Sequence, residues 1–560
     1  MTDIQHNEII KYLEEKGYDC VDIGNHAGDI FIDVMVNNEE MRLKCKFPDS
    51  FPYTFPKVYI LKEFYKGIAP LPHIDKEGYI CTFDSNKSFP NFKKPNELVF
   101  ECIRKAVEVI EDGINGINRD DFIEEFQSYW GMEEKYSSMF WMLSTPTNKS
   151  TSLYYYNDKY KDFYIGDEIE KIKEYLKHLK GLEINNKDLK RCIYLPLTKP
   201  WYPPYPKTNK EIYTKVKEES KVFKAYYNSL KNKEDMSIII FSQEVNGERY
   251  LGGWMHEAVK TPNGFRKGKI IPELVYLVHN KDNEVIKFRV NQLDRRRLFN
   301  RGGDGNIISN LKVSITGCGS IGSYLTQVLS ELSVDNFILI DNQRLTSENI
   351  ARHMCGASDI GEPKTEAIKE KLIKHYPYIK CKSMGKDVFD VLQTDVTIFN
   401  DCDINFVVVG NKPIEAKFIE LFNQDKITKP IIIIWVEPFL LGGHAIIMQQ
   451  NQKIESILYD NEYNFKYSVV ENGGNYTRKE AGCESTYIPY SAFEAKQFIY
   501  SFLHYFRSNH MTKETEGNYL FSWCGNLKWA RKEDIMISDL WLSKQNRTVK
   551  IQRLDTYDKV

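Results

Sequence analysis

The chain has 560 residues, of which 42% are hydrophobic and 28% are charged, and its formal net charge is -2. At roughly 100–200 residues per domain, this length predicts three or four soluble domains. The near-neutral balance excludes a strongly basic nucleic-acid-binding protein, so we expect no direct nucleic-acid partner.

No pattern in the chain is typical of export, membrane insertion or a zinc site. The first seventeen residues, MTDIQHNEIIKYLEEKG, are charged and amphipathic, unlike a signal peptide. The longest apolar runs, such as residues 431–436, are too short to cross a membrane. The 11 cysteines lie at wide spacings without a CxxC pair. We therefore expect a cytoplasmic protein with reduced thiols and no membrane association.

Residues 1–130 carry the pattern of a small α+β domain. Apolar residues recur at helical spacing in two segments and alternate in the segments between them. The expected elements are a helix over residues 4–15, strands near residues 19–23, 29–36 and 41–47, and a helix over residues 96–113.

Cys81 lies in LPHIDKEGYICTFD, shortly after the proline-rich run FPDSFPYTFPKVYIL. These motifs resemble the ubiquitin-conjugating fold over about residues 1–130. The resemblance implies that Cys81 is a catalytic acyl acceptor and that His73 is an orienting or base residue. Such enzymes carry a His-Pro-Asn triplet, whereas this chain reads Leu-Pro-His, so the asparagine that supports the oxyanion is missing here. The alternative is that Cys81 is a core cysteine.

Residues 131–290 predict a mixed linking domain without a catalytic constellation. Its lysine-rich helical segments are expected at residues 167–179 and 210–231, and its strands at residues 192–197, 237–242 and 284–290. The proline-aromatic run KPWYPPYPK predicts a loop or an extended connection.

Residues 291–560 repeat strand, glycine-rich turn, helix and strand. Further apolar strands are expected near residues 406–409 and 430–436. This alternation predicts a mostly parallel sheet with helices on both faces, which is a Rossmann-like doubly wound fold. The chain as a whole is thus predicted to be a multidomain α/β protein.

A glycine-rich turn follows the short apolar strand at residues 313–316. Gly317, Gly319 and Gly322 permit a tight turn and close approach of the backbone to a phosphate at a helix N-terminus. Asp341 ends the next strand, where an acidic residue binds ribose hydroxyls. These residues alone fit NAD, FAD, S-adenosylmethionine or ATP.

Asn349, Arg352 and Lys364 follow this motif and narrow the choice. A site that handles a triphosphate needs cations to offset charge that develops on the α-phosphate, whereas a dehydrogenase has no general need of them. The alternative is that Arg352 and Lys364 are solvated surface residues. We expect ATP as the cofactor.

The glycine turn, Asp341, Asn349, Arg352 and Lys364 resemble the adenylation domain of ubiquitin-activating enzymes and of bacterial activators of sulfur-carrier proteins. The resemblance covers roughly residues 295–500. It implies adenylation of a protein carboxylate, with Arg352 and Lys364 as catalytic cations and with Mg²⁺ as a second cofactor.

The same resemblance implies a homodimer, in which an arginine of the run RRRLFNR reaches the ATP of the partner subunit. Arg301 is our choice within this run, and a solvated basic turn is the alternative. The family places a metal-binding aspartate after the strand near residues 406–409, but this chain has Gly410 there. The metal ligands are therefore unknown, with Asp401 and Asp403 as candidates.

Cys483 lies in the polar stretch KEAGCESTYIPYS, ahead of a helix expected over residues 492–506. Its place resembles that of the thioester-forming cysteine of activating enzymes, and a thiolate readily attacks an acyl adenylate. The alternative is an inert small residue at a turn. Glu437 follows the strand expected at residues 430–436, where it either lines the nucleotide, carries part of the metal function or is a satisfied carboxylate at a strand end. We expect His444 to be structural.

In chain order, the three predicted domains are residues 1–130, 131–290 and 291–560. This layout resembles the bacterial fusion protein of cyclic-oligonucleotide-based antiphage signalling (CBASS) systems. The resemblance implies that the C-terminus of a cGAS-like nucleotidyltransferase is activated, bound to Cys483, passed to Cys81 and conjugated to an amine on a target.

Three alternatives remain open at this point. The first is a sulfur-carrier-protein adenylyltransferase of cofactor biosynthesis, which needs no conjugating cysteine. The second is a non-catalytic scaffold for a nucleotidyltransferase, and the third is a dinucleotide-dependent oxidoreductase.

Overall fold

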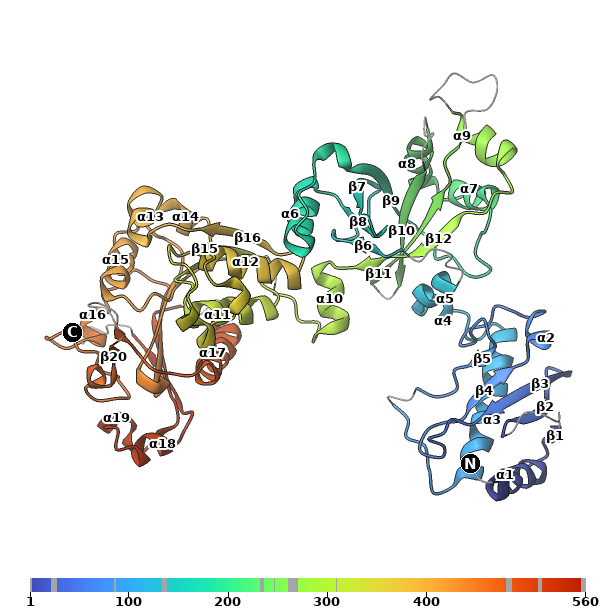
Figure 1. Cartoon of the computed structure of the whole chain (residues 1–560), viewed down its shortest axis with the longest axis horizontal. Helices are drawn as coiled ribbons and strands as arrows, with labels where there is room; N and C mark the ends of the chain where they lie inside the picture. The colour runs from blue at the N-terminus through green and yellow to red at the C-terminus, as the bar shows by residue number, and fades with distance from the viewer. Residues whose placement is uncertain are drawn as a thin grey trace. The chain divides into compact units, whose positions relative to one another are not determined.

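The computed structural model describes residues 3–21, 28–84, 87–132, 138–231, 236–245, 247–259, 270–308, 310–479, 486–511 and 516–554 (Figure 1). The chain forms two compact units. Unit 1 comprises residues 1–142, 146–169 and 185–292, and unit 2 comprises residues 143–145, 170–184 and 293–560. No helix among the described residues is long and apolar enough to cross a bilayer.

Unit 1 begins with a five-stranded antiparallel sheet in the order β1-β2-β3-β4-β5. Alternate residues of β3 are buried, because one face of the sheet packs against two helices. The elements are α1 (Asp3–Glu15), β1 (Asp19–Val21), β2 (Ile30–Val36), β3 (Glu39–Lys46), β4 (Lys57–Ile60), α2 (Lys62–Tyr65), β5 (Tyr79–Ile80) and α3 (Pro95–Ile114). The predicted order of helix, meander and helix is confirmed.

The rest of unit 1 is built on a mixed sheet of eight strands in the order β12-β11-β10-β9-β7-β8-β6-β13. Its strands are β6 (Phe140–Met142), β7 (Thr151–Asn157), β8 (Phe163–Gly166), β9 (Lys190–Pro196), β10 (Ser237–Val245), β11 (Glu248–His256), β12 (Ile286–Arg289) and β13 (Asn291–Gln292). Its helices include α4 (Asp121–Glu124), α5 (Phe126–Met132), α7 (Asn209–Lys217), α8 (Ser220–Leu230) and α9 (Pro272–Leu274).

The predicted loop KPWYPPYPK is irregular, but its aromatic side chains anchor the core of unit 1. Trp201 and Tyr205 are buried there with Trp130, Phe241 and Trp254. The indole N–H of Trp130 donates a hydrogen bond to the carbonyl oxygen of Gly253 at 3.1 Å. Aromatic burial therefore stabilises a segment that has no regular secondary structure.

Unit 2 contains an eight-stranded sheet in the order β16-β15-β14-β17-β18-β19-β22-β23. Its strands are β14 (Lys312–Thr316), β15 (Asn336–Ile340), β16 (Lys380–Met384), β17 (Ile404–Val407), β18 (Ile431–Val436), β19 (Gly442–Met448), β22 (Tyr519–Cys524) and β23 (Val549–Arg553). The first five are parallel, as predicted, and the last three are antiparallel. The segment between β18 and β19 is too short for the crossover that a parallel pair requires.

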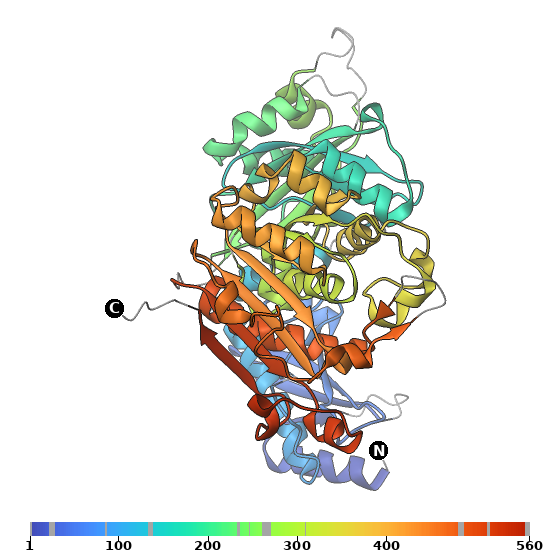
Figure 2. The same ribbon diagram turned by 90° about the vertical axis from the view of Figure 1, so that its left-hand side faces the viewer.

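Helices cover both faces of this sheet (Figures 1 and 2). Phe337 and Leu339 of β15 belong to one core with α11, α12 and α17, whereas Ile338 and Ile340 belong to a second core with α13, α14 and α15. The helices of unit 2 include α6 (Ile169–Lys180), α10 (Arg295–Gly302), α11 (Ser320–Glu331), α12 (Lys364–His375), α13 (Val388–Thr394), α14 (Thr397–Asn400), α15 (Lys412–Asn423) and α17 (Ala492–Phe506). The doubly wound prediction is confirmed.

Candidate active site

A cavity of about 620 Å³ lies where the sheet of unit 2 reverses its strand order, between β14 and β17. Ligands of doubly wound folds bind at this position, outside the carboxyl ends of the strands. The cavity is lined by Gly319, Ser320, Ile321, Gln343, Asn349, Arg352, His353, Lys364, Val408, Val409, Gly410, Lys412, Glu415, Ile434, Trp435, Val436, Tyr459, Phe465, Tyr487, Ile488 and Tyr490. Four of the predicted site residues, Gly319, Asn349, Arg352 and Lys364, are thus brought together.

The three predicted glycines differ in what they do. Gly317 has a φ of +94°, and a Cβ there would lie 2.6 Å from the carbonyl oxygen of Val408. A Cβ on Gly322 would lie 1.9 Å from the carbonyl oxygen of Gly317. A Cβ on Gly319, by contrast, would meet nothing within 4 Å. The fold itself requires Gly317 and Gly322, whereas Gly319 leaves space at the N-terminus of α11 for a ligand.

Asp341 binds the glycine turn through its carboxylate. Its carboxylate accepts hydrogen bonds from the backbone N–H groups of Cys318 at 2.7 Å and Gln343 at 2.8 Å. Asp341 is not one of the described residues that line the cavity. Its predicted contact with ribose stays a prediction, and the contacts present here fix the shape of the turn.

His353 is a residue of this site that the sequence patterns did not reveal. Its Nδ1 accepts a hydrogen bond from the backbone N–H of Cys355 at 3.0 Å, so Nε2 carries the proton and donates to the carbonyl oxygen of Cys318 at 2.9 Å. Burial lowers the pKa of His353, which keeps the ring neutral. A neutral histidine therefore binds the carbonyl oxygen of Cys318, the residue whose N–H is bound by Asp341.

Lys364 and Arg352 are both held in position at the cavity. The buried Lys364 donates from Nζ to Oε1 of Gln343 at 2.6 Å. Arg352 donates to the carbonyl oxygen of Ile488 at 2.8 Å, and its guanidinium lies 5.6 Å and 5.0 Å from the ring centroids of Tyr487 and Tyr490. These contacts hold two cations beside the open turn.

Asn349 and Arg301 have simpler surroundings. Asn349 accepts a hydrogen bond from the backbone N–H of Thr346 at 3.2 Å and so closes the short helical turn that carries Arg352. Arg301 is an exposed residue in the last turn of α10. Its contact with ATP of a partner subunit stays a prediction.

Glu415 is the one acidic side chain among the described residues that line the cavity. It is buried, and its Oε1 has no hydrogen-bond partner among the described residues. Burial raises the pKa of Glu415 to about 7. Sequence reasoning missed it, although Glu415 occupies the apolar stripe of α15 with Phe418, Ile419 and Phe422.

Neither metal candidate from the sequence belongs to this cavity. Asp403 accepts a hydrogen bond from the backbone N–H of Lys312 at 2.8 Å, which places it at the amino end of β14. Asp401 ends α14, at the same edge of the sheet. Both candidates are therefore wrong, because the cavity lies at the carboxyl ends of the strands.

The described residues of the cavity also supply no protein ligand set for Mg²⁺. Gly410 lies in its wall with a φ of +60°, and Glu415 supplies one carboxyl group among apolar and aromatic neighbours. No group of three or more His, Cys, Asp or Glu residues in the described part of the chain could hold a metal ion. The residues present do not fit a protein-held Mg²⁺, and we assign no step to that ion.

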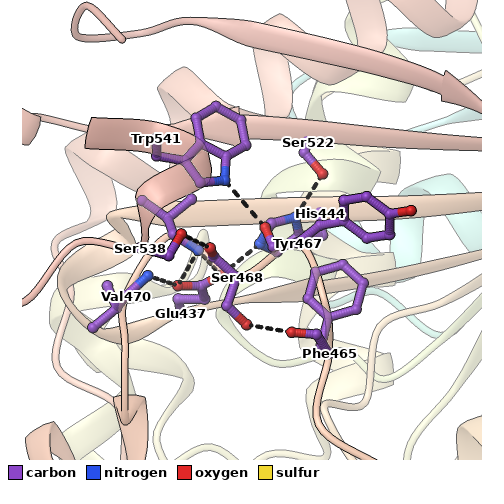
Figure 3. A network of polar contacts seen from close by, with 10 residues as sticks. Glu437, His444, Phe465, Tyr467, Ser468, Val470, Ser522, Ser538 and Trp541 are labelled. Carbon is purple, nitrogen blue, oxygen red and sulfur yellow. Dashed lines mark hydrogen bonds and ion pairs between the residues drawn. The ribbon is translucent and has the colours of Figure 1, made fainter. Parts of the chain in front are cut away.

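Glu437 and His444 form a buried structural network (Figure 3). Glu437 accepts hydrogen bonds from Nε2 of His444 at 2.7 Å and from the backbone N–H groups of Val469 at 2.8 Å and Val470 at 2.7 Å. Nδ1 of His444 lies 2.9 Å from the hydroxyl of Ser522. Glu437 is thus a satisfied carboxylate at a strand end, and His444 is structural, as expected.

Cys483 lies outside the described residues. The segments on either side of it, β20 (Arg478–Lys479) and β21 (Thr486–Tyr487), pair in antiparallel register. Tyr487 lines the cavity.

Cys81 is exposed directly after β5. Its backbone N–H donates to the carbonyl oxygen of His73 at 2.8 Å. Burial of the thiol group raises the pKa of Cys81, and Glu125 and Asp84 raise it further. The thiol is therefore accessible but mostly protonated at neutral pH, which lowers the fraction of the nucleophilic thiolate.

His73 is held by two carboxylates that sequence reasoning missed. Its Nε2 lies 2.8 Å from Oδ2 of Asp121, and its Nδ1 lies 3.3 Å from Oε1 of Glu125. Glu125 first and then Asp121 raise the pKa of His73 to about 9. An imidazolium at neutral pH does not accept a proton, so the predicted base role does not fit. An orienting role through the His73 backbone does.

A larger cavity, of about 940 Å³, lies in unit 1. Lysine and arginine side chains dominate its charged lining, namely Lys149, Lys199, Lys221, Lys224 and Arg249. It contains none of the predicted site residues, and we place the candidate chemistry in the smaller cavity of unit 2.

Two families match separate parts of the chain. Residues 19–139 match the prokaryotic E2 family B, and residues 294–418 match the ThiF family. The chain therefore joins an E2-like N-terminal region to a ThiF-like C-terminal region.

Curated relatives share low identity over long regions. The "ATP-dependent ubiquitin transferase-like protein Cap2" of Vibrio cholerae is 22% identical over 78% of this chain and 80% of its own length. The protein of the same name from Pseudomonas aeruginosa is 20% identical over 60% of this chain, and the match spans 62% of that protein, less than two thirds.

Solved structures resemble the chain over less than half of its length. A crystal structure of PaaA has a TM-score of 0.29 and 14% identity, and covers 44% of this chain and 65% of that one. E. coli MccB with ATP has a TM-score of 0.27 and 17% identity, and covers 44% of this chain and 64% of that one.

Proposed function

We propose that this protein uses ATP to activate the C-terminal carboxylate of a partner protein and conjugates it to an amine on a target. A cGAS-like nucleotidyltransferase in a CBASS system is the proposed partner, and the enzyme works in the cytoplasm as a homodimer. The supporting observation is the cavity of unit 2, which combines the open turn at Gly319 with the cations Arg352 and Lys364.

In the first step, a carboxylate oxygen attacks the α-phosphorus of ATP, and the bond to pyrophosphate breaks. Arg352 and Lys364 offset the negative charge that develops on the phosphates. Free N–H groups at the start of α11 bind a phosphate at the space that Gly319 leaves. The products are an acyl adenylate and pyrophosphate.

In the next steps, the Cys483 thiolate attacks the acyl carbon and AMP leaves. The Cys81 thiolate then attacks the Cys483 thioester, and the Cys483 thiolate is released. Finally, an amine attacks the Cys81 thioester and forms an amide bond, with loss of the amine proton and return of the Cys81 thiol. Covalent fusion of the two regions raises the effective concentration of the second thiol.

Two observations favour conjugation over sulfur-carrier activation. The E2 family B match covers Cys81, and the Cys81 thiol is exposed at the end of β5. A sulfur-carrier activator needs no second acceptor thiol. Retention of the two cations and the open turn also favours an active enzyme over a scaffold.

The test incubates the full chain with ATP and a purified cGAS-like nucleotidyltransferase, and detects thioesters by non-reducing gel and intact mass. We expect Cys483→Ala to abolish both thioesters and Cys81→Ala to leave the Cys483 adduct. Cys20→Ala, which changes a partly buried thiol on β1, is the matched control. A stable target conjugate formed by the Cys81→Ala variant would contradict the relay, and absence of pyrophosphate release would favour the scaffold.

A further inference from the structure

The larger cavity, of about 940 Å³, lies at one edge of the mixed sheet in unit 1. Strands β9 and β10 are parallel, and the lining includes the chain that leaves the carboxyl end of β9 and Glu244 near the carboxyl end of β10. The start of β11, the residues just before β7 and one face of α8 complete the wall. Small ligands bind at the carboxyl ends of parallel strands, in cavities of this size.

Cations dominate the charge of this lining. Five lysine and arginine side chains reach it, against one carboxylate among the described lining residues, that of Glu244. This carboxylate already has a partner, since it lies 2.8 Å from the guanidinium of Arg249. The chain as a whole has a formal net charge of -2, so the excess of positive charge is local. The four lysines are exposed and form no ion pair within the described part of the chain; they are Lys149, Lys199, Lys221 and Lys224.

Buried side chains hold parts of this lining in place. Arg249 donates a hydrogen bond to the hydroxyl of the buried Ser242 at 3.0 Å. The buried carboxylate of Glu219 accepts hydrogen bonds from the backbone N–H groups of Thr198 and Lys199, both at 3.2 Å. The guanidinium and the loop that carries Lys199 are thus positioned before a ligand arrives, which reduces the entropy cost of binding.

Helix α8 supplies a row of lining residues at helical spacing. Lys221, Lys224 and Asn228 are three and four positions apart and therefore share one face of the helix. The two ammonium groups repel each other, and Lys221 lies in the first turn, where the helix dipole already contributes positive charge. This arrangement is unfavourable for the isolated helix and becomes favourable when an anion binds.

The lining favours an anion with a high density of charge over one that needs a flat platform. Its lysines come from three segments of the chain and surround one cavity, and an ammonium group binds phosphate oxygens as a point charge. No aromatic side chain is among the described lining residues, so they offer no stacking surface for a series of bases.

We propose that this cavity binds a small oligophosphate, a chain of linked phosphates that is either free or part of a nucleotide. The four lysines contact its non-bridging oxygens, and Arg249 adds positive charge at the wall. This site differs from the cavity of unit 2 and goes beyond the proposed function.

The test titrates inorganic tripolyphosphate into the full chain by calorimetry. Mg²⁺ is left out, because it would neutralise the phosphates. The chain carries Arg352→Ala and Lys364→Ala throughout, so that the cavity of unit 2 contributes little. We expect Lys221→Ala combined with Lys224→Ala to weaken binding at least about tenfold, since each change removes a charge-assisted contact.

A second pair of changes and a matched control make the result specific. Lys149→Ala combined with Lys199→Ala, from the other two segments of the lining, should weaken binding to a similar extent. The control, Lys215→Ala combined with Lys217→Ala, removes the same charge from exposed positions of α7 outside the lining. It should change affinity by less than about twofold, because salt screens charges that do not touch the ligand. Thermal unfolding of each variant checks that the fold is retained.

ATP and GTP, titrated in the same way, distinguish the two sources of the phosphate chain. Nucleotide affinity no higher than that of tripolyphosphate identifies a free oligophosphate, and tighter nucleotide binding that the lysine changes abolish identifies a nucleotide. No binding of tripolyphosphate, or an affinity that neither lysine pair changes, would overturn the site. An equal loss in the α7 control would also overturn it, because the attraction would then be non-specific.

Discussion

The cavity of unit 2 and the surroundings of Cys81 in unit 1 carry opposite charge. The cavity presents Arg352, Lys364 and Lys412 against one carboxyl group, that of Glu415. Near Cys81, Asp84 and Glu125 raise the pKa of the thiol, and Glu125 is itself bound to His73.

The two charge patterns suit different reactants. ATP brings several negative charges, and fixed cations stabilise the charge that moves onto pyrophosphate. The proposed amine of a target is cationic before it reacts, and an acidic surface attracts it. A raised thiol pKa also keeps Cys81 mostly protonated, which lowers the thiolate fraction available for attack on thioesters and on small electrophiles alike.

Removal of the cavity cations should have the largest effect of the changes that test this difference in charge. We expect Arg352→Ala and Lys364→Ala each to lower ATP–pyrophosphate exchange by about 10²–10³-fold, the usual loss for a fixed transition-state donor. Lys417→Ala, a change of a lysine that pairs with Glu420 on α15, is the control and should retain activity. Exchange within about threefold of wild type in either cavity variant would contradict the assignment.

The two glycines of the phosphate turn separate folding from binding. Gly322→Ala should destabilise unit 2 by about 1–3 kcal/mol or more, because its Cβ would overlap the carbonyl oxygen of Gly317. Gly319→Ala should change stability by less than about 0.5 kcal/mol and still weaken ATP binding about tenfold. Thermal unfolding and calorimetric ATP titration of both variants provide the measurement. Equal stability losses would show that Gly319 has a structural role.

The acidic surroundings of His73 predict a pH-dependent contribution to stability. The folded-state pKa of about 9 is above the ordinary value of 6.5. The contribution is therefore complete below about pH 6.5 and is lost as the pH rises through about 9. Because solvent screens the half-exposed carboxylates, we expect this contribution to the free energy of unfolding to be about 1–2 kcal/mol. His73→Gln should lower the unfolding temperature of the protein more at pH 6.5 than at pH 10. An equal decrease at both pH values would contradict the ion pairs.

The smallest expected effect concerns the Cys81 thiol. Asp84→Asn removes one of the charges that raise its pKa, so the thiolate fraction at pH 7 increases. We expect alkylation of Cys81 by iodoacetamide to accelerate about two- to threefold. Asp49→Asn, in the loop before β4, is the control. The rates are followed by peptide mass spectrometry, and a slower reaction in Asp84→Asn would contradict the charge argument.

Local patterns predicted most of the fold and half of the cavity. The helix α3 and the strands around Gly317 follow from apolar spacing. Arg352 and Lys364 reach the cavity because both follow β15, whose carboxyl end lies beside that of β14. Asp401 and Asp403 failed as metal candidates for the same reason, since they precede β17 and lie at the opposite edge.

Other features depend on contacts between distant segments. The carboxylates that bind His73 lie 48 and 52 positions later in the chain, on or beside α4. The packing of α15 against β18 and Tyr459 buries the carboxyl group of Glu415 and leaves its Oε1 without a partner among the described residues. No local sequence pattern encodes that packing. Its place on an apolar stripe was the one available signal.

The clamp on Arg352 has a consequence for the order of events. Tyr487, Ile488 and Tyr490, which hold this guanidinium, belong to the stretch that begins at the strand after Cys483. Under the proposed function, any displacement of that stretch toward the adenylate also weakens the grip on Arg352. The two half-reactions thus depend on the same stretch of chain. If the bound nucleotide changes the free energy of moving this stretch, movement of the stretch changes the free energy of binding that nucleotide by the same amount.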